Sequence, residues 1–332
     1  MASRKGKSRK LVVRKKKSSP AVRGRNSKTS SAKSVVTPAH LKLIVDRIHG
    51  NACVPFLGAA ANVTNKNFRY EGLPLGAELA STFIKLIAFA GRDTQNLARV
   101  TLEYEFATDR LSLVGELEKT LPDFSRRPSP LLDALAKFPF KLIITTNYDR
   151  LLERALERRK VAFESLSQPS GGFLDNRQTR RRFDELEEYK GLILYKIHGS
   201  FDVPAGGSPP PSVIITEDDY IEFLTVLGRE KGRIGIPKLI VKTLAPSTLL
   251  FLGYSLEDWD FRTVYKGWIE NLPANERRKS FAFQKDPPEF WVRFWSRKGI
   301  EIYDIDLYDF AQQLERRYIA DYGKPAPRLK AR

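Results

Sequence analysis

The sequence has little of what disulfides, metal centres and membrane spans require. Among its 332 residues there are one cysteine, Cys53, and three histidines. A single cysteine cannot form an intrachain disulfide or a multi-cysteine zinc site, and it is typical of proteins from a reducing compartment. No segment approaches the roughly 18 consecutive apolar residues of a membrane helix, and no apolar stretch follows the basic N-terminus as in a secretory signal. We therefore expect a cytoplasmic protein with no metal site and no membrane contact.

Acidic residues are missing from the first 37 positions. This segment holds 13 of the 57 lysines and arginines and none of the 39 acidic residues, so it carries most of the net charge of +18. A serine-rich, basic segment cannot bury a core, which predicts a disordered tail over residues 1–37. A second basic tail is expected at 323–332. The N-terminal tail either solubilises the protein or contacts nucleic acid or an acidic partner, and both interpretations stay open.

Residues 38–322 are predicted to form one α/β domain. The chain is 42% hydrophobic, which is ample for a core. Short apolar runs alternate with helical periodicity, a pattern that predicts a Rossmann-like, mostly parallel sheet with helices on both faces. Residues from about 94 to 138 show helical periodicity without strand signals, so we expect an inserted helical subdomain there.

Three apolar runs, each predicted to be a buried strand, end abruptly in polar or small residues. In chain order these ends carry Thr145, Thr146, Asn147 and Asp149, then His198, and then Gly253 and Ser255, with Asp258 just beyond. Open α/β sheets bind ligands in the crevice beyond the carboxyl ends of their strands. We therefore expect these residues to share a site.

An earlier predicted strand ends in small residues, which is a weaker signal. It leads into Gly58, Ala59, Ala60 and Asn62. Small residues let the backbone approach a pyrophosphate, and free amides at a helix start favour an anion. The dinucleotide fingerprint requires several glycines, however, and only Gly58 is present, so close packing of strand and helix explains the same residues.

Asn147 and His198 are the strongest candidates for chemistry. A carboxamide both donates and accepts, so Asn147 can hold a ribose hydroxyl or a water in one orientation. The imidazole of His198 is suited to taking a proton from either group. Structural interpretations compete: Asn147 can form a turn, Asp149 can cap the following helix, and His198 can be a buried structural histidine.

Together and in this order, the elements resemble those of sirtuins. Sirtuins carry Gly-Ala-Gly-x-Ser, Gly-Ile-Pro, Thr-Gln-Asn-x-Asp, His-Gly and Gly-Thr-Ser. The counterparts here are residues 58–62, 72–74, 145–149, 198–199 and 253–255. The region from 38 to about 320 is similar to the sirtuin-like domain of prokaryotic antiphage defence proteins, in which Thr-Asn-Tyr-Asp and Gly-Tyr-Ser are the usual forms.

The resemblance implies an activity. Deacylating sirtuins carry a four-cysteine zinc module that this chain cannot build, so it resembles the zinc-less branch, whose members split NAD into nicotinamide and ADP-ribose. By that resemblance NAD is the substrate and Asn147 and His198 carry catalysis. The expected NAD-binding residues are Gly58, Ala59, Ala60 and Asn62 at the pyrophosphate, Gly253, Ser255 and Asp258 at the adenosine ribose, and Thr146 and Asp149 beside Asn147.

Two positions depart from the family pattern, and two alternative functions stay open. Ala60 stands where the family has a second glycine, and Asn62 stands where it has serine. A methyl group at Ala60 would crowd a phosphate, so we expect altered affinity. The alternatives are an NAD-dependent deacylase or ADP-ribosyl transferase, and a non-catalytic module that binds NAD or nucleic acid.

Partners are implied by the resemblance together with the length of the chain. Members of this family work with a fused nucleotide-binding domain, a short Argonaute or a HerA-type ATPase. The length leaves no room for a large fused sensor, so we expect a separate sensor protein and a homo-oligomer. Hydrolysis would be restrained until infection and would then deplete NAD in an abortive response.

Overall fold

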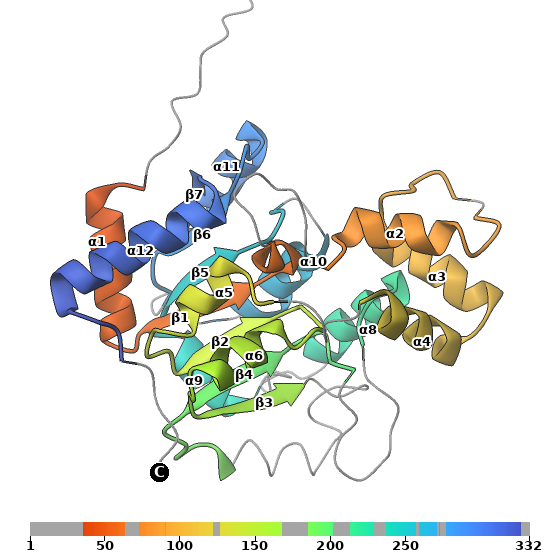
Figure 1. The fold of residues 1–332 in the computed structure, drawn as a ribbon. Coiled ribbons are helices and arrows are strands. Elements are labelled where there is room, and N and C mark those ends of the chain that lie inside the picture. Colours follow the sequence, from red (N-terminus) through yellow and green to blue (C-terminus); the bar gives the residue numbers. More distant parts are fainter. Residues whose placement is uncertain are drawn as a thin grey trace, which may run out of the picture. The chain divides into compact units, whose positions relative to one another are not determined.

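The computed structural model describes residues 36–63, 73–89, 91–121, 127–167, 185–201, 213–228, 237–256, 259–270, 272 and 277–326. Their centre is a seven-stranded sheet with the order β3-β4-β2-β1-β5-β6-β7, in which every pairing is parallel (Figure 1). The strands are β1 (Cys53–Leu57), β2 (Leu142–Thr145), β3 (Phe163–Ser167), β4 (Leu192–Lys196), β5 (Thr248–Leu252), β6 (Ser280–Gln284) and β7 (Ile300–Asp304). The predicted Rossmann-like fold class is confirmed.

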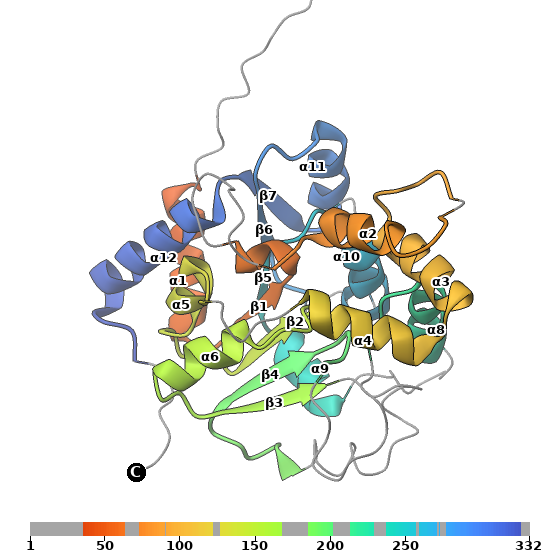
Figure 2. The same ribbon diagram turned by 45° about the vertical axis from the view of Figure 1, so that its right-hand side comes forward.

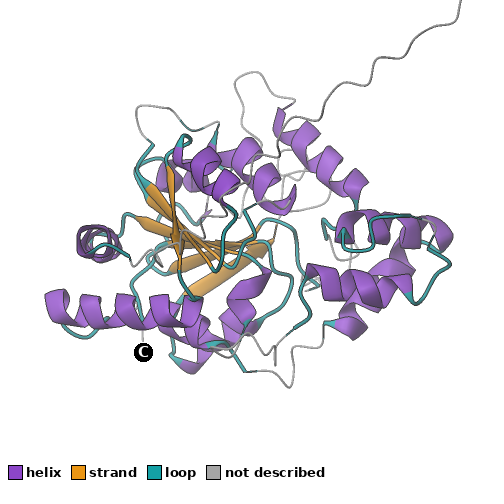
Figure 3. Cartoon of the chain, turned by 90° about the horizontal axis from the view of Figure 1, so that it is seen from above, coloured by secondary structure: helices purple, strands orange, loops and turns teal. Residues whose placement is uncertain are grey.

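Helices cover both faces of this sheet, as Figure 3 shows from above. One face packs against α1 (Pro38–His49), α5 (Pro130–Leu135), α6 (Leu151–Arg158) and α12 (Leu307–Tyr322). The other packs against α9 (Lys238–Leu244), α10 (Trp259–Val264), the π-helical turn η2 (Tyr265–Ile269) and α11 (Glu289–Ser296). Because side chains alternate along a strand, Ile143 and Leu194 point into the first layer and Ile144 and Tyr195 into the second.

The helix starts follow local sequence signals. Thr37 caps α1 by accepting a hydrogen bond from the His40 N–H, and Pro38 stands at the first helical position, as predicted. Ser129 and Pro130 play the same two parts at the start of α5. Capping residues of this kind are worth about 1 kcal/mol each, so they set where the helices begin while the buried faces hold them on the sheet.

A helical subdomain stands beside the sheet (Figure 2). It consists of α2 (Gly76–Ile84), α3 (Leu97–Ala107) and α4 (Arg110–Thr120), which share an apolar cluster with Val213 and Ile215, just before α8 (Glu217–Gly228). The subdomain begins and ends earlier in the chain than the insertion expected at 94–138. The apolar face of α2 belongs to this cluster, whereas α5 buries Leu131 and Leu135 in the core beneath the sheet.

Most of the two predicted tails lies outside the described residues, which leave out 1–35 and 327–332. Val36 is described and is buried against the first helical layer, two residues before the predicted start of the domain. None of the helices in the described ranges is long and apolar enough to cross a bilayer.

Cys53 should be inert until the sheet opens. It lies at the start of β1, is buried, and burial raises the pKa of its thiol, so the reactive thiolate is suppressed. Because it is the chain's one cysteine, we expect labelling by a soluble disulfide reagent to be at least about 10³-fold slower in the native protein than in urea. Rapid labelling without denaturant would contradict this placement of β1.

Candidate active site

A cavity of about 690 Å³ opens at the carboxyl ends of β4, β2, β1 and β5. Its opposite wall comes from the start of α2 and from residues 93–98 before and within α3. Nine predicted site residues line it: Ala59, Ala60, Asn62, Thr146, Asn147, Asp149, His198, Gly253 and Ser255. A smaller cavity of about 360 Å³, at the amino ends of β5, β6 and β7, contains none of them. Asp258 lies outside the described residues.

Asn147 lies just beyond β2 and is held by two hydrogen bonds. Its backbone N–H donates to Thr145 Oγ1 at 3.0 Å, and its side-chain Nδ2 donates to Gly58 O at 3.1 Å. The second bond ties the carboxamide to the loop after β1, so Gly58 contacts the site although it does not line the cavity. Oδ1 is then the atom of this amide that would accept a hydrogen bond from a ligand.

Gly58 and Gly253 have no room for a side chain because the loops after β1 and β5 touch. A Cβ on Gly58 would lie 2.6 Å from Gly253 O, and one on Gly253 would lie 2.2 Å from Ala61 N. Gly253 also has a φ of +82°, which favours glycine. The amides of Ala60 and Ala61 donate to Gly253 O and Gly58 O, each at 3.0 Å. Close packing thus explains both glycines, and two amides of the small-residue loop bond within the protein.

Asn62 and Asp149 meet between the loops after β1 and β2. Asn62 Nδ2 donates to Asp149 Oδ2 at 2.6 Å, and the Leu151 N–H at the start of α6 donates to Asp149 Oδ1 at 2.9 Å. Burial raises the pKa of the Asp149 carboxyl, and the nearby Lys196 ammonium opposes the rise. Since the folded-state pKa lies above the ordinary value, ionised Asp149 opposes folding at neutral pH. That cost declines as the pH falls through the raised pKa.

His198 follows β4, next to the end of β2, and lines the cavity although it is only 1% exposed. Two rings of α8 pack edge-on against its imidazole: Tyr220 at 5.4 Å and Phe223 at 5.9 Å between centroids. These contacts set the plane of the imidazole and leave a small part of it facing the cavity. The position of α8 therefore governs access to His198.

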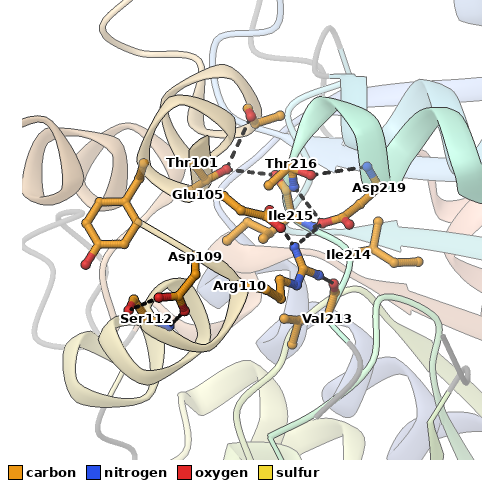
Figure 4. A network of polar contacts seen from close by, with 12 residues as sticks. Thr101, Glu105, Asp109, Arg110, Ser112, Val213, Ile214, Ile215, Thr216 and Asp219 are labelled. Atoms are coloured by element: carbon orange, nitrogen blue, oxygen red, sulfur yellow. Dashed lines mark hydrogen bonds and ion pairs between the residues drawn. The ribbon is translucent and has the colours of Figure 1, made fainter. Parts of the chain in front are cut away.

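Residues 213–216, which we call the linking segment, connect the helical subdomain with the loop that carries His198. Figure 4 shows their contacts with α3, α4 and α8. The Ile214 N–H donates to His198 O at 3.0 Å, and Tyr148 Oη donates to Ile214 O at 2.6 Å. From the subdomain, Thr101 Oγ1 donates to Ile215 O at 3.2 Å. The linking segment therefore contacts both loops that carry the candidate catalytic residues.

An arginine of the helical subdomain holds the linking segment to α8. Arg110 donates to Val213 O and pairs with Asp219 and Glu105, each at 3.0 Å. Asp219 Oδ2 also accepts from the N–H groups of Ile215 and Thr216, at 2.8 and 2.9 Å. One guanidinium thus connects α4, α3, the linking segment and the first turn of α8.

The cavity lining includes residues that were not predicted as site residues from the sequence, among them Tyr148, Tyr220 and Arg262. Tyr148 is the variable position of the Asn147 motif, Tyr220 sits on α8, and Arg262 sits on α10 with its guanidinium 5.9 Å from the Trp291 ring centroid. Arg262 is the only lysine or arginine among the cavity-lining residues within the described ranges. Its place on the helix after the third polar strand end was the available signal. No group of three or more metal-ligating side chains occurs among the described residues.

We expect Arg110→Ala to lower the free energy of unfolding by about 1.5–3 kcal/mol, because it leaves Val213 O and the Asp219 carboxylate without their charged donor. Arg99→Ala is the matched control, since it removes another arginine that pairs with α8, through Glu217, but is 49% exposed. The control should cost about 0–1 kcal/mol. Urea unfolding measures both changes, and equal losses would show that the linking segment does not depend on Arg110.

Comparison with known proteins finds one matching family model and several relatives. Residues 141–303 match the family model described as the SIR2-like domain. The NAD(+) hydrolase ThsA of Acinetobacter baumannii (strain 532279) is 26% identical over 74% of this chain and 45% of its own length. That of Bacillus cereus (strain MSX-D12) is 29% identical over 64% and 41%. Defense-associated sirtuin 2 of Bacillus subtilis is 25% identical over 59% and 17%.

This chain therefore spans less than half the length of these curated relatives. The matched region begins at β2 and ends at β7, so it includes three of the four strand ends around the cavity. The sirtuin resemblance of the motifs is confirmed: residues 141–303 are similar to the SIR2-like domain, and the chain is similar to the ThsA hydrolases and to Defense-associated sirtuin 2.

Proposed function

We propose that this chain is an NAD⁺ glycohydrolase that releases nicotinamide and ADP-ribose. The observation that carries the proposal is the convergence of Asn147 and His198, from neighbouring strand ends, on one cavity that the small-residue loop after β1 also lines. The relatives named NAD(+) hydrolase supply the choice of substrate and reaction. The cavity volume falls within the usual range of ligand pockets, about 300–1,000 Å³.

Asn147 is proposed to orient water and the nicotinamide ribose. Its Nδ2 is engaged with Gly58 O, so the carboxamide is held before any ligand arrives. Its Oδ1 would accept a hydrogen bond from a ribose hydroxyl or from the attacking water. A group fixed in this way lowers the entropic cost of reaching the reacting geometry.

His198 is proposed to be the base. The bond between the ribose C1′ and the nicotinamide nitrogen breaks, and its electron pair leaves with nicotinamide. A water oxygen bonds to C1′, and the proton of that water passes to His198 and then to solvent. C1′ is oxocarbenium-like while the bond to nicotinamide breaks, so the protein needs to supply positioning, a base and charge stabilisation.

The rest of the cavity is proposed to hold the two phosphates and the adenosine. Gly58, Ala59, Ala60 and Asn62 stay the pyrophosphate candidates, and the Arg262 guanidinium adds a cation suited to a phosphate oxygen. Gly253, Ser255 and Asp258 are the candidates for the adenosine ribose, with Thr146 and Asp149 beside Asn147. The Ala60 methyl group and the Ala60 N–H bond to Gly253 O favour weaker phosphate binding than a Gly-Ala-Gly loop provides.

We also propose the biological setting. Unrestrained NAD hydrolysis would kill the host, so the chain would act in the cytoplasm as a restrained effector of antiphage defence, with abortive infection as the outcome. A separate sensor, such as a HerA-type ATPase or a short Argonaute, would switch it on, and the chain would work as a homo-oligomer. This setting is supported by the motif resemblance and by the relative named Defense-associated sirtuin 2.

The test is NAD consumption and nicotinamide release by the purified protein at high concentration. Asn147→Ala and His198→Ala should each lower the turnover number by about 10²-fold or more, since each removes a group that acts on the reacting atoms. His49→Ala is the matched control: this histidine stacks on Tyr322 between α1 and α12, does not line the cavity, and should leave turnover unchanged.

Each alternative has its own outcome in this test. Hydrolysis that persists in both cavity variants would contradict the assignment of the site. A wild-type protein that consumes NAD only with acylated peptide would be a deacylase. One that binds NAD with micromolar affinity and never turns it over, with or without a candidate sensor, would be a binding module.

A further inference from the structure

The end of β4 carries a buried ion pair that the proposed reaction does not use. The side chain of Lys196 is fully buried, that of Glu153 on α6 is 2% exposed, and Nζ lies 2.9 Å from Glu153 Oε1. Burying two charges costs desolvation energy that their attraction offsets only in part, and well-packed apolar residues are often as stable. Stability alone is therefore a weak reason for this pair.

The contacts of the Lys196 ammonium point to another role. An ammonium has three N–H donors, and Nζ has three acceptors: Glu153 Oε1 at 2.9 Å, Asp149 O at 2.6 Å and Tyr148 O at 3.2 Å. Two of the three are the backbone carbonyls that directly follow Asn147. Charge-assisted bonds are stronger than neutral ones and are stronger again in a buried setting, so they hold this stretch of backbone firmly.

Lys196 also has a fixed place relative to His198. It is the last residue of β4, two positions before His198, and it is the register partner of Thr145 on β2. The Ile197 N–H donates to Thr145 O at 3.0 Å, so the two strand ends are joined up to the residue before the histidine. The backbone of Lys196 therefore leads into the loop that carries His198, and its side chain binds the loop that carries Asn147.

The carboxyl groups of Glu153 and Asp149 both lie near the Lys196 ammonium. Glu153 Oε1 also accepts from Ser165 Oγ on β3 at 3.3 Å, so the oxygen that binds Lys196 has a second donor. The Asp149 carboxyl faces Asn62 and Leu151 and lies near Lys196 without bonding to Nζ in the structure. Lys196 therefore binds the loop after β2 through the carbonyl oxygens of Tyr148 and Asp149.

We propose that Lys196 is a positioning residue that sets the distance between Asn147 and His198 by binding the Tyr148 and Asp149 carbonyls. This proposal rests on the proposed hydrolysis, in which both side chains must act on the same water and ribose. A displacement of about 1 Å between reacting groups costs about 10²-fold in rate. The effect of Lys196 should therefore appear in kcat and leave KM nearly unchanged.

The test is a double variant, Lys196→Met with Glu153→Leu, in the full chain. It replaces the ion pair with apolar side chains of similar volume, so the protein should stay folded, whereas Lys196→Met alone leaves Glu153 buried without its cation and should melt earlier. We expect the double variant to stay folded but to melt below the wild type, because Tyr148 O and Asp149 O lose their charged donor, and above Lys196→Met alone. It should lose at least about tenfold in kcat, with KM within about twofold.

A second readout is independent of NAD. The Thr146 N–H donates to Leu57 O and the Asn147 N–H to Thr145 Oγ1, so hydrogen exchange of the peptide around 145–151 reports whether this loop is held. In the double variant this peptide should exchange faster, while peptides from α12 should not change. A wild type without NAD hydrolysis would defeat the proposed function, and exchange alone would then decide the role of Lys196.

Two further variants control the experiment. Lys137→Met with Glu315→Leu makes the same change in the ion pair between the end of α5 and α12, away from the cavity, and should alter neither kcat nor exchange around 145–151. Glu153→Gln keeps both carbonyl contacts of Lys196 and should keep kcat within about threefold, which tests the proposal even if the double variant does not fold.

Unchanged kcat or unchanged exchange in a folded double variant would overturn the proposal. So would a loss in Glu153→Gln as large as that in the double variant, because the charge of Glu153 and not the carbonyl contacts of Lys196 would then be responsible.

Discussion

Parallel pairing of β4, β2, β1 and β5 is the constraint on which the site depends. It brings four carboxyl ends to one edge of the sheet, where the backbone groups beyond the last pairs need partners. The Leu57 carbonyl shows how they are satisfied: it accepts from the Thr146 N–H at 3.0 Å and from Thr145 Oγ1 and Tyr254 Oη, each at 3.1 Å. One oxygen at the end of β1 thus joins the loops after β2 and β5, and the cavity forms above them.

Different interactions hold the two walls of the cavity at this edge of the sheet. On the sheet side, close glycine contacts and buried hydrogen bonds leave little freedom for the loops that carry Gly58, Asn147 and Gly253. On the other side, the helical subdomain and α8 are held through the partly exposed Arg110 and Asp219 and through the backbone of the linking segment. Partly exposed ion pairs are weaker than buried contacts, so this wall is the one that a partner or a ligand would move most easily.

Sequence reasoning succeeded where a local residue pattern indicates one structure whatever packs against it. The apolar runs predicted buried strands, and their polar ends predicted that Asn147 and His198 share a site, which agrees with the cavity that both line. The sheet order that makes β2 and β4 neighbours was not predicted. It was less successful where the structure of a segment depends on its tertiary contacts. Edge strand β3 was not predicted, since Phe163–Ser167 is only partly buried and alternates weakly. The expectation of free amides in the loop after Gly58 did not include the bonds of Ala60 and Ala61 within the protein.

The sequence by itself determined the α/β class, the polar strand ends and the order of the sirtuin-like motifs, because hydrophobic periodicity and short motifs are local properties of the chain. Only the tertiary structure decided that Lys196 reaches the loop carrying Asn147, that α8 nearly covers His198, and that Arg262 joins the cavity. Lys196 and Asp149 are 47 positions apart, and His198 and Tyr220 belong to different elements. Contacts of this kind depend on how the sheet and its helices pack, and a sequence pattern does not carry that information.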